Sequence, residues 1–550
     1  MFENLRRWLA AHPRWALTLA TLAALVPFLA KPFNIDDPLF LWAAKQIQLH
    51  PLDPYGFNVN WYGVSQPMWS VTENPPLACY FLALSALIFG WSEVGLHTAY
   101  LLPALAVVWG TWRLAQKFCT RPLLVALLVL FAPLFLVSAT TLMCDVLMLA
   151  FWVWAVVFWL EGVEQKSGGK QLLAACLMSL SLLAKYYGIC LVPLLAAYSL
   201  IQERKLNCRM ANLLIPLAAL AAFELLTKKL YGHALFVSAA DYAQATKGSL
   251  GHSGLMRSLQ AFGFVGAGIA AAVFLAPWLW SRRTFLILAG GVLIVTGLAV
   301  FIGALPQQYG AVSADAKFSL GLQAWFWIAG AILLLVAVVA DLTQRRDATA
   351  WLLALWIGGT LVFAAYLNWT VNARSLLPLV PALAILVVRR LERNSAAAKP
   401  VAFAVTLGAL LGMAVAHADF LYAIAVRQSA AETITKFTPE NSNLWFQGHW
   451  GFQFYMEKWG AFVIDTKHPG LKPGDNLAMP LANTSLLPID PANTELLGTI
   501  SVSGPHGLST WNPVVGGGFY AAVTGPLPFA FGRVPAEQVA VYKLKPVTKP

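Results

Sequence analysis

Charged side chains are scarce in this chain: Asp, Glu, Lys and Arg make up 11% of its 550 residues, whereas hydrophobic residues make up 59%. Soluble domains usually carry about 25% charged residues, so this shortage excludes an ordinary water-soluble globular protein. Apolar runs of about 20 residues, each long enough to cross a bilayer as a helix, account for such a composition. The sequence therefore predicts a mainly α-helical, polytopic membrane protein.

Other features that the sequence lacks narrow the function further. All six cysteines lie at or before Cys208, so nothing suggests a disulfide framework or a cysteine-based zinc site in the C-terminal region. The net charge is +12, but the basic residues are not gathered in one patch, which argues against a nucleic-acid partner. No phosphate-binding glycine loop, dinucleotide-binding fingerprint or nucleophilic serine elbow stands out.

The apolar runs predict about 13 transmembrane helices. The runs cover residues 14–31, 94–113, 122–138, 145–163, 170–186, 189–203, 210–230, 259–281, 284–304, 322–341, 349–367, 374–391 and 400–422. Arg6, Arg7 and Arg14 accompany the first run, and no clean cleavage site follows it, so we predict an uncleaved span rather than a signal peptide. With a cytoplasmic N-terminus every second connection is basic, as the positive-inside rule requires.

The remaining connections are long and fall on the outer side of the membrane. They cover residues 32–93, 231–258 and 305–321, and a tail follows from about residue 428. Residues 37–49 and 76–89 suit helices that lie in the membrane interface. Short strand-like runs punctuated by Gly and Pro begin after residue 427. We therefore predict a transmembrane domain over 1–427 and an α/β domain over 428–550, periplasmic if the membrane is a bacterial inner membrane.

Asp36 stands directly before the first of these interfacial helices and Asp37 opens it, with Pro38 next in the sequence. Asp36 as a helix N-cap is the structural alternative, since Pro is favoured in a first helical turn. Capping explains one acid but not two neighbours in a chain so poor in charge. The pair therefore suggests a general base, or oxygen ligands for a divalent cation such as Mg²⁺ or Mn²⁺, and the sequence suits both equally.

Three more charged residues fall at the outer ends of predicted helices. Asp145 opens one helix and Lys185 closes the next, positions that also suit an N-cap and a snorkelling lysine. Arg374 opens a helix, where the dipole disfavours a cation unless an anion lies nearby. The predicted topology puts all three at the level of Asp36 and Asp37. Acids and bases at one level suggest a site for a phosphate-bearing substrate.

Weaker candidates lie in the outer loops and the tail. Glu73 suits a supporting or metal ligand, as Asp145 does, or a loop brace, and Asn74, which follows it, is a weak candidate for an acceptor or sugar contact. Tyr309 is a similar weak candidate in an outer loop without diagnostic spacing. His449 stands in an aromatic-rich turn, where it faces a sugar or, as we favour slightly, packs the tail.

The order of short motifs resembles a known family. The motifs are Asp36-Asp37, Pro75-Pro76-Leu77 with Tyr80, Asp145, Leu183-Ala184-Lys185-Tyr186 and Arg374-Ser375-Leu376-Leu377-Pro378-Leu379. In this order they resemble the C-type glycosyltransferase superfamily, in particular its protein mannosyltransferases and lipid A aminoarabinose transferases. The resemblance covers roughly residues 10–390.

The resemblance implies a membrane enzyme that moves a hexose or pentose from a polyprenyl phosphate to an acceptor lipid, glycan or protein outside the cytoplasm. Asp36 then corresponds to the presumed base, and we expect an inverting displacement by a monomer, with Lys185 and Arg374 at the donor phosphate. The second acid is Asp37 where relatives carry Glu, and Asn74 stands where they often carry Lys or His. The rival hypotheses are a flippase or transporter of lipid-linked sugars and a polymerase or ligase of surface glycans.

Overall fold

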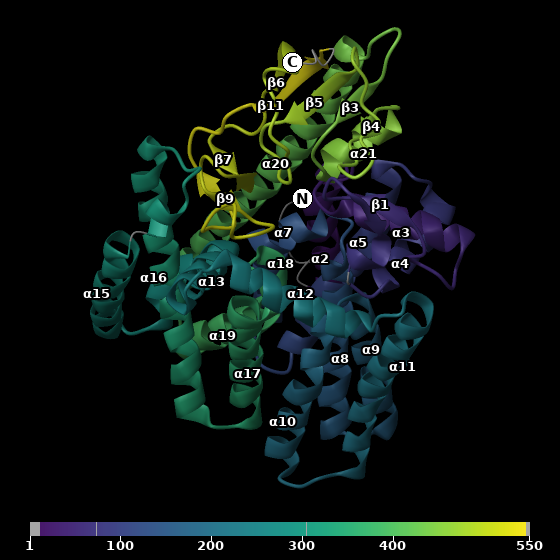
Figure 1. Cartoon of the computed structure of the whole chain (residues 1–550). Helices are drawn as coiled ribbons and strands as arrows, with labels where there is room; N and C mark the ends of the chain where they lie inside the picture. Colours follow the sequence, from purple (N-terminus) through teal and green to yellow (C-terminus); the bar gives the residue numbers. More distant parts are fainter. Residues whose placement is uncertain (1–10, 73, 304, 546–550) are drawn as a thin grey trace.

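The computed structural model describes residues 11–72, 74–303 and 305–545. Its helices form one large body beneath a smaller group of strands from the C-terminal part of the chain (Figure 1). The helices up to residue 250 are α2 Pro13–Leu25, α3 Asp37–Leu49, α4 Leu77–Phe89, α5 Glu93–Ala115, α6 Pro122–Leu130, α7 Pro133–Ala139, α8 Cys144–Glu164, α9 Gly168–Ala184, α10 Leu191–Glu203, α11 Leu214–Tyr231 and α12 Leu235–Leu250. The later ones are α13 Gly254–Gly268, α14 Ala270–Phe274, α15 Arg282–Gly297, α16 Ala314–Arg345, α17 Ala348–Val362, α18 Ala373–Leu376, α19 Leu379–Arg393, α20 Ala398–Phe437 and α21 Trp450–Lys458.

Every predicted apolar run falls on one or more of these helices. Within the described residues, seven helical segments are long and apolar enough to cross a membrane, and they contain α5, α8, α11, α15, α16, α17 and α20. The number rises to eight if α6 and α7 form one span with a 61° bend. That bend falls at Pro133, because proline cannot donate the backbone hydrogen bond that would continue α6. The protein is an integral membrane protein, mainly α-helical, with a small C-terminal strand region.

Several predicted cytoplasmic loops meet at one end of the helical body. The carboxylate of Glu161, in the last turns of α8, accepts from Arg113 at 2.8 Å and from Lys170 at 2.5 Å. Asp341, near the end of α16, pairs with Arg389 at 3.1 Å. Asp145 lies in the first turn of α8, and the 21-residue length of that helix corresponds to about 30 Å, a bilayer core. The basic loops and the candidate site therefore lie at opposite ends of the helices.

The C-terminal strands form a mixed sheet in the order β4-β3-β5-β11-β6. Its strands are β3 Leu444–Phe446, β4 Phe462–Val463, β5 Asn476–Pro480, β6 Thr494–Val502 and β11 Glu537–Leu544. Strands β3, β4 and β5 are parallel, and α21 connects β3 to β4. β11 is antiparallel to β5 and β6. The sheet and α21 agree with the predicted α/β character of the tail.

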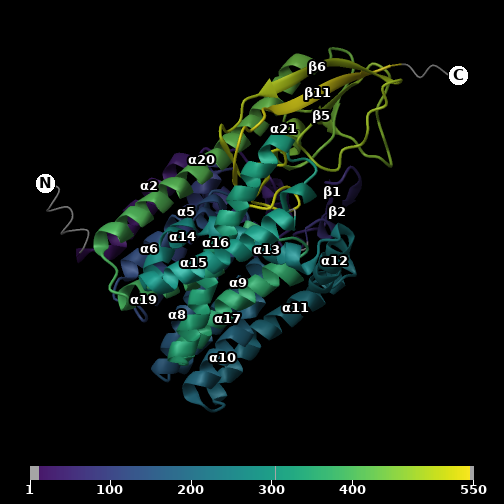
Figure 2. The ribbon, with the colours of Figure 1, turned by 90° about the vertical axis from the view of Figure 1, so that its left-hand side faces the viewer.

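Helix α20 joins the helical body to this sheet. It runs unbroken from Ala398 to Phe437, across the predicted domain boundary at residue 427. At about 1.5 Å per residue its 40 residues span about 60 Å, twice the thickness of a bilayer core. Figure 2 shows α20 passing along the helical body and continuing beside the strands. The sheet is thus held on a rigid helix rather than on a flexible linker.

The other strands are short pairs. β1 Asn58–Asn60 and β2 Ser65–Pro67 form a hairpin in the first outer loop. β7 Leu508–Ser509, β8 Trp511–Asn512, β9 Gly517–Gly518 and β10 Ala530–Phe531 all lie in the connection between β6 and β11. In Figure 1 this connection lies below the main sheet, toward the helices.

Candidate active site

Asp36 occupies the N-cap position of α3, but its side chain makes no capping hydrogen bond. The residue before it, Ile35, has a φ of 50°, a left-handed conformation that strains a β-branched side chain by about 1–3 kcal/mol. The Asp36 carboxylate instead accepts from Nη2 of Arg374 at 3.0 Å. The capping alternative therefore does not account for this acid.

The two acids of the pair occupy different environments. The Asp36 side chain is 28% exposed, whereas Asp37 is 1% exposed. The oxygens of Asp37 accept the backbone N–H groups of Asn34 at 3.1 Å and Leu142 at 2.9 Å. Burial raises the pKa of Asp37 to about 6, although the nearby ammonium of Lys31 and these two hydrogen bonds oppose the rise. Asp36 is thus the accessible acid, and Asp37 ties the start of α3 to the turn before α8.

The structure brings the other predicted charges into one network with Asp36. Asp145 accepts from Nζ of Lys185 at 2.7 Å, and its second oxygen lies 4.0 Å from Nη1 of Arg374. Asp36, Arg374, Asp145 and Lys185 therefore alternate in sign across four elements of the fold. Asn372 caps α18 by accepting from Ser375 N, which fixes the backbone on both sides of Arg374.

The carboxylates of this network do not form a metal site. Over the described parts of the chain, no three Asp, Glu, His or Cys side chains gather in a metal-binding arrangement. Cations already pair with Asp36 and Asp145, and backbone N–H groups take both oxygens of Asp37. A Mg²⁺ or Mn²⁺ ion needs several free oxygen ligands, so the described residues by themselves do not supply a complete set for the expected cation.

A second pair of charges next to this network was missed from the sequence. Lys31 and Asp419 form an ion pair of 2.5 Å, and each side chain is 1% exposed. Asp419 also accepts from the hydroxyls of Thr510 at 2.6 Å and Tyr520 at 3.0 Å. One signal was available: Asp419 is an acid inside the apolar run 400–422, and charges in such runs are rare without a partner.

The structure describes three of the four weaker candidates, and those three lie outside the charged network. Glu73 falls outside the described residues, and the backbone carbonyl of Asn74 accepts from Tyr55 at 2.7 Å. Tyr309 is buried, where it accepts from Gln260 at 2.6 Å and donates to the carbonyl of Ala522 at 2.8 Å. That contact joins an outer loop to the connection between β6 and β11.

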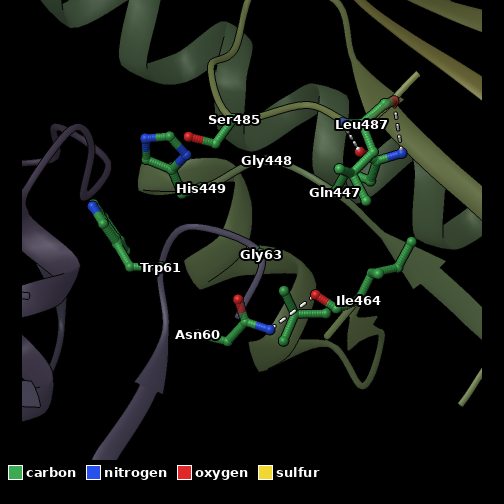
Figure 3. Close-up of a pocket in the computed structure, with 10 residues that line it drawn as sticks. Asn60, Trp61, Gly63, Gln447, Gly448, His449, Ile464, Ser485 and Leu487 are labelled. Atoms are coloured by element: carbon green, nitrogen blue, oxygen red, sulfur yellow. Dashed lines mark hydrogen bonds between the residues drawn. The ribbon is translucent and has the colours of Figure 1, made fainter. Parts of the chain in front are cut away.

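His449 packs at the junction of the tail and the first outer loop. Its ring lies 5.0 Å from that of Trp61, and Figure 3 shows the two rings side by side at the cavity. The cavity has a volume of about 10 Å³, room for about one water molecule and too little for a sugar. Burial lowers the pKa of His449 to about 3, so the ring stays neutral at physiological pH. This position agrees with the packing alternative.

Comparison with known proteins gives one sequence match. A family model described as dolichyl-phosphate-mannose-protein mannosyltransferase matches residues 73–226, under a third of the chain. The match includes Asp145 and Lys185, while Asp36 and Arg374 lie outside it. A search of curated protein sequences found no match.

Solved structures of low identity align with much of the chain. The Archaeoglobus fulgidus oligosaccharyltransferase tethered with an acceptor peptide aligns at 12% identity and a TM-score of 0.47, over 85% of this chain and 66% of that one. ArnT from Cupriavidus metallidurans bound to undecaprenyl phosphate aligns at 13% and 0.41, over 86% and 93% of the two chains. The arabinofuranosyltransferase AftD from Mycobacteria aligns at 14% and 0.42, over 99% and 40%.

These alignments carry no argument about function, because every one of the TM-scores lies below 0.5. This chain also spans slightly less than two thirds of the archaeal protein's length. The resemblance that the motif order indicated is nevertheless confirmed: the chain resembles C-type glycosyltransferases, and residues 73–226 match the protein mannosyltransferase model among them.

Proposed function

We propose that this protein is a membrane glycosyltransferase that moves a sugar from a polyprenyl phosphate to an acceptor on the outer side of the membrane. One observation carries the proposal: Asp36, Arg374, Asp145 and Lys185 form one charged network at the end of the helices opposite the basic loops. A site with an accessible carboxylate beside two cations suits an acceptor hydroxyl and a departing phosphate.

The proposed reaction is a single inverting displacement with Asp36 as the base. The acceptor oxygen attacks the anomeric carbon, its proton passes to the Asp36 carboxylate, and the bond between that carbon and the phosphate oxygen breaks. The lipid departs as a polyprenyl phosphate monoester. Asp36 takes this role rather than Asp37 because Asp36 is accessible, whereas both oxygens of Asp37 are occupied by backbone donors.

Arg374 and Lys185 are proposed to bind the donor phosphate. Arg374 lies between Asp36 and Asp145, so a phosphate bound to its guanidinium sits next to the base. As the phosphate binds the guanidinium, the Asp36 carboxylate is released from its ion pair and is free to accept the proton of the acceptor hydroxyl, which couples phosphate binding to proton removal. Asp145 orients Lys185 and Arg374 and balances their charge when the donor is absent.

The remaining assignments complete the proposal. Glu73 remains a proposed supporting ligand and Asn74 a proposed acceptor contact in the first outer loop, whereas burial makes Tyr309 and His449 the weaker acceptor contacts. We propose about 13 crossings, interfacial helices α3 and α4, a cytoplasmic N-terminus and a monomer in a bacterial inner membrane. The domains are 1–427 and a periplasmic 428–550. The contacts among the basic loops at one end of the helices support this orientation.

The deciding experiment is transfer from a radiolabelled polyprenyl-phosphate sugar by the purified protein. Asp36→Asn should lower the rate by about 10²–10⁴, the usual contribution of a general base. The matched control is Asp53→Asn, another acid of the first outer loop, which accepts from Tyr231 outside the charged network and should stay within about twofold of wild type.

The outcomes separate the alternatives. Full activity in Asp36→Asn contradicts its role as base, and retention of the donor's anomeric configuration contradicts a single displacement. Use of a diphosphate donor alone favours a polymerase or ligase. Movement of the lipid-linked sugar without transfer favours a flippase.

A further inference from the structure

The connection between β6 and β11, residues 503–536, leaves the C-terminal sheet and returns to the helical body. The backbone N–H of Ala373 donates to the carbonyl of Phe519 at 2.9 Å, and Ala522 N–H donates to the carbonyl of Val371 at 2.8 Å. These two bonds hold the β6–β11 loop against the segment that precedes Arg374. A part of the chain about 150 residues away in sequence thus borders the charged network.

Tyr520 is the residue of this loop that reaches Arg374. The guanidinium carbon of Arg374 lies over the Tyr520 ring, 5.7 Å from its centroid, within the range of a cation–π contact. The Tyr520 side chain is 4% exposed, so water does not weaken the attraction. Asp36 accepts from Nη2 at 3.0 Å, Asp145 lies 4.0 Å from Nη1, and the ring covers a face of the same guanidinium.

The position of the Tyr520 ring is itself fixed at its far end. Its hydroxyl donates to Asp419, at 3.2 Å from Oδ1 and 3.0 Å from Oδ2. Asp419 is held in turn by Lys31 and by the hydroxyl of Thr510. A ring anchored through its hydroxyl cannot swing away from Arg374 without breaking a buried hydrogen bond.

We propose that Tyr520 is a positioning residue that holds Arg374 for the donor phosphate, and that the β6–β11 loop thereby completes the site. This inference rests on the proposed function, in which Arg374 binds that phosphate. A freely rotating arginine side chain loses conformational entropy when it binds an anion. The fixed ring reduces this loss, so the C-terminal region contributes to donor affinity without touching the donor.

The test is binding of undecaprenyl phosphate to the full-length protein in lipid nanodiscs. Tyr520→Met removes the aromatic face and some side-chain volume, and should weaken binding about tenfold, an effect of the size of the conformational entropy lost when one arginine side chain is immobilised. Tyr520→Phe keeps the ring and should stay within about threefold of wild type. Thr510→Val removes another donor to Asp419 but no contact with Arg374, and should retain wild-type affinity.

A double-mutant cycle with Arg374→Gln separates positioning from a general structural role. If Tyr520 acts through Arg374, Tyr520→Met causes no further loss in the Arg374→Gln background. Equal losses in both backgrounds overturn the inference, as do equal losses in Tyr520→Phe and Tyr520→Met. Tyr520→Leu serves as a second variant without an aromatic ring. If neither Tyr520→Met nor Tyr520→Leu folds while Tyr520→Phe does, the ring has a general structural role and the inference is overturned. Absence of binding to wild type overturns the donor assignment and this inference together, whereas binding with additive losses overturns this inference alone.

Discussion

The buried ion pair between Lys31 and Asp419 gives the sharpest stability prediction. Each side chain is 1% exposed and the charged atoms are 2.5 Å apart, so loss of one partner leaves a charge in a water-free place. Removing one member of such a pair costs about 3–5 kcal/mol of unfolding free energy. For Lys31→Met we expect a loss of unfolding free energy at the lower end of this range, about 3 kcal/mol, because Asp419 keeps the hydroxyls of Thr510 and Tyr520 as hydrogen-bond donors.

The reverse substitution should cost more. In Asp419→Asn the ammonium of Lys31 loses its counter-charge and keeps only neutral partners, the new amide oxygen and the hydroxyl of Thr140, 3.2 Å away. We expect a loss of about 4 kcal/mol. The double variant Lys31→Met with Asp419→Asn carries no unpaired charge and should recover most of the loss.

Unfolding free energies can be measured by denaturant titration in mild detergent micelles, followed by the fluorescence of the protein's 22 tryptophans. Lys436→Met is the matched control, because it breaks an exposed pair with Glu432 on the same helix, α20, and should cause no measurable change. A loss below about 1 kcal/mol in Lys31→Met, or a double variant less stable than either single one, would refute the reasoning.

Two further predictions concern the surroundings of Asp36. Because the pKa of Asp37 is raised from 3.8 to about 6, the folded state retains a proton that the unfolded state loses, so the free energy of unfolding should fall by about 2.5 kcal/mol as the pH rises from 4 to 7. Asp37→Asn should remove that slope in pH-dependent unfolding, and an unchanged slope would contradict the assignment. Gly451→Ala should lower the free energy of unfolding by about 1–3 kcal/mol and should also lower transfer activity. The added carbon would lie 2.5 Å from the carbonyl oxygen of Phe33, in the segment that leads to Asp36. Gly290→Ala, where the added carbon meets nothing within 4 Å, is the control and should be neutral or stabilising, and equal losses in the two variants would count against a steric origin.

The positions of the helices could be predicted because a membrane constrains each segment locally. A chain in lipid must satisfy its backbone hydrogen bonds within the segment, so an apolar run of sufficient length is already a helix. The alternation of basic loops then placed Asp145 and Lys185 at the same end of their helices, and the structure joins them by an ion pair of 2.7 Å. Even the bend before Pro133 had a local signal, which the span prediction did not use.

The tail was less predictable. Its α/β character followed from short strand-like runs punctuated by Gly and Pro, but the continuation of α20 to Phe437 did not follow from a composition shift near residue 427. The return of the β6–β11 loop to the helices had no local signal, because Gly and Pro mark a turn but not what the turn packs against. The role of Tyr520 at Arg374 was therefore invisible in the sequence.

By itself, the sequence determined that the protein is helical, crosses a membrane and carries the charges of the candidate site at one end of its helices. Only the tertiary structure decided how those charges pair. Arg374 meets Asp36 across 338 positions, and Lys31 meets Asp419 across 388. Local propensity and hydropathy act over a few turns of helix, whereas these contacts depend on how the whole helical body packs. The same packing leaves Asp36 accessible and buries Asp37.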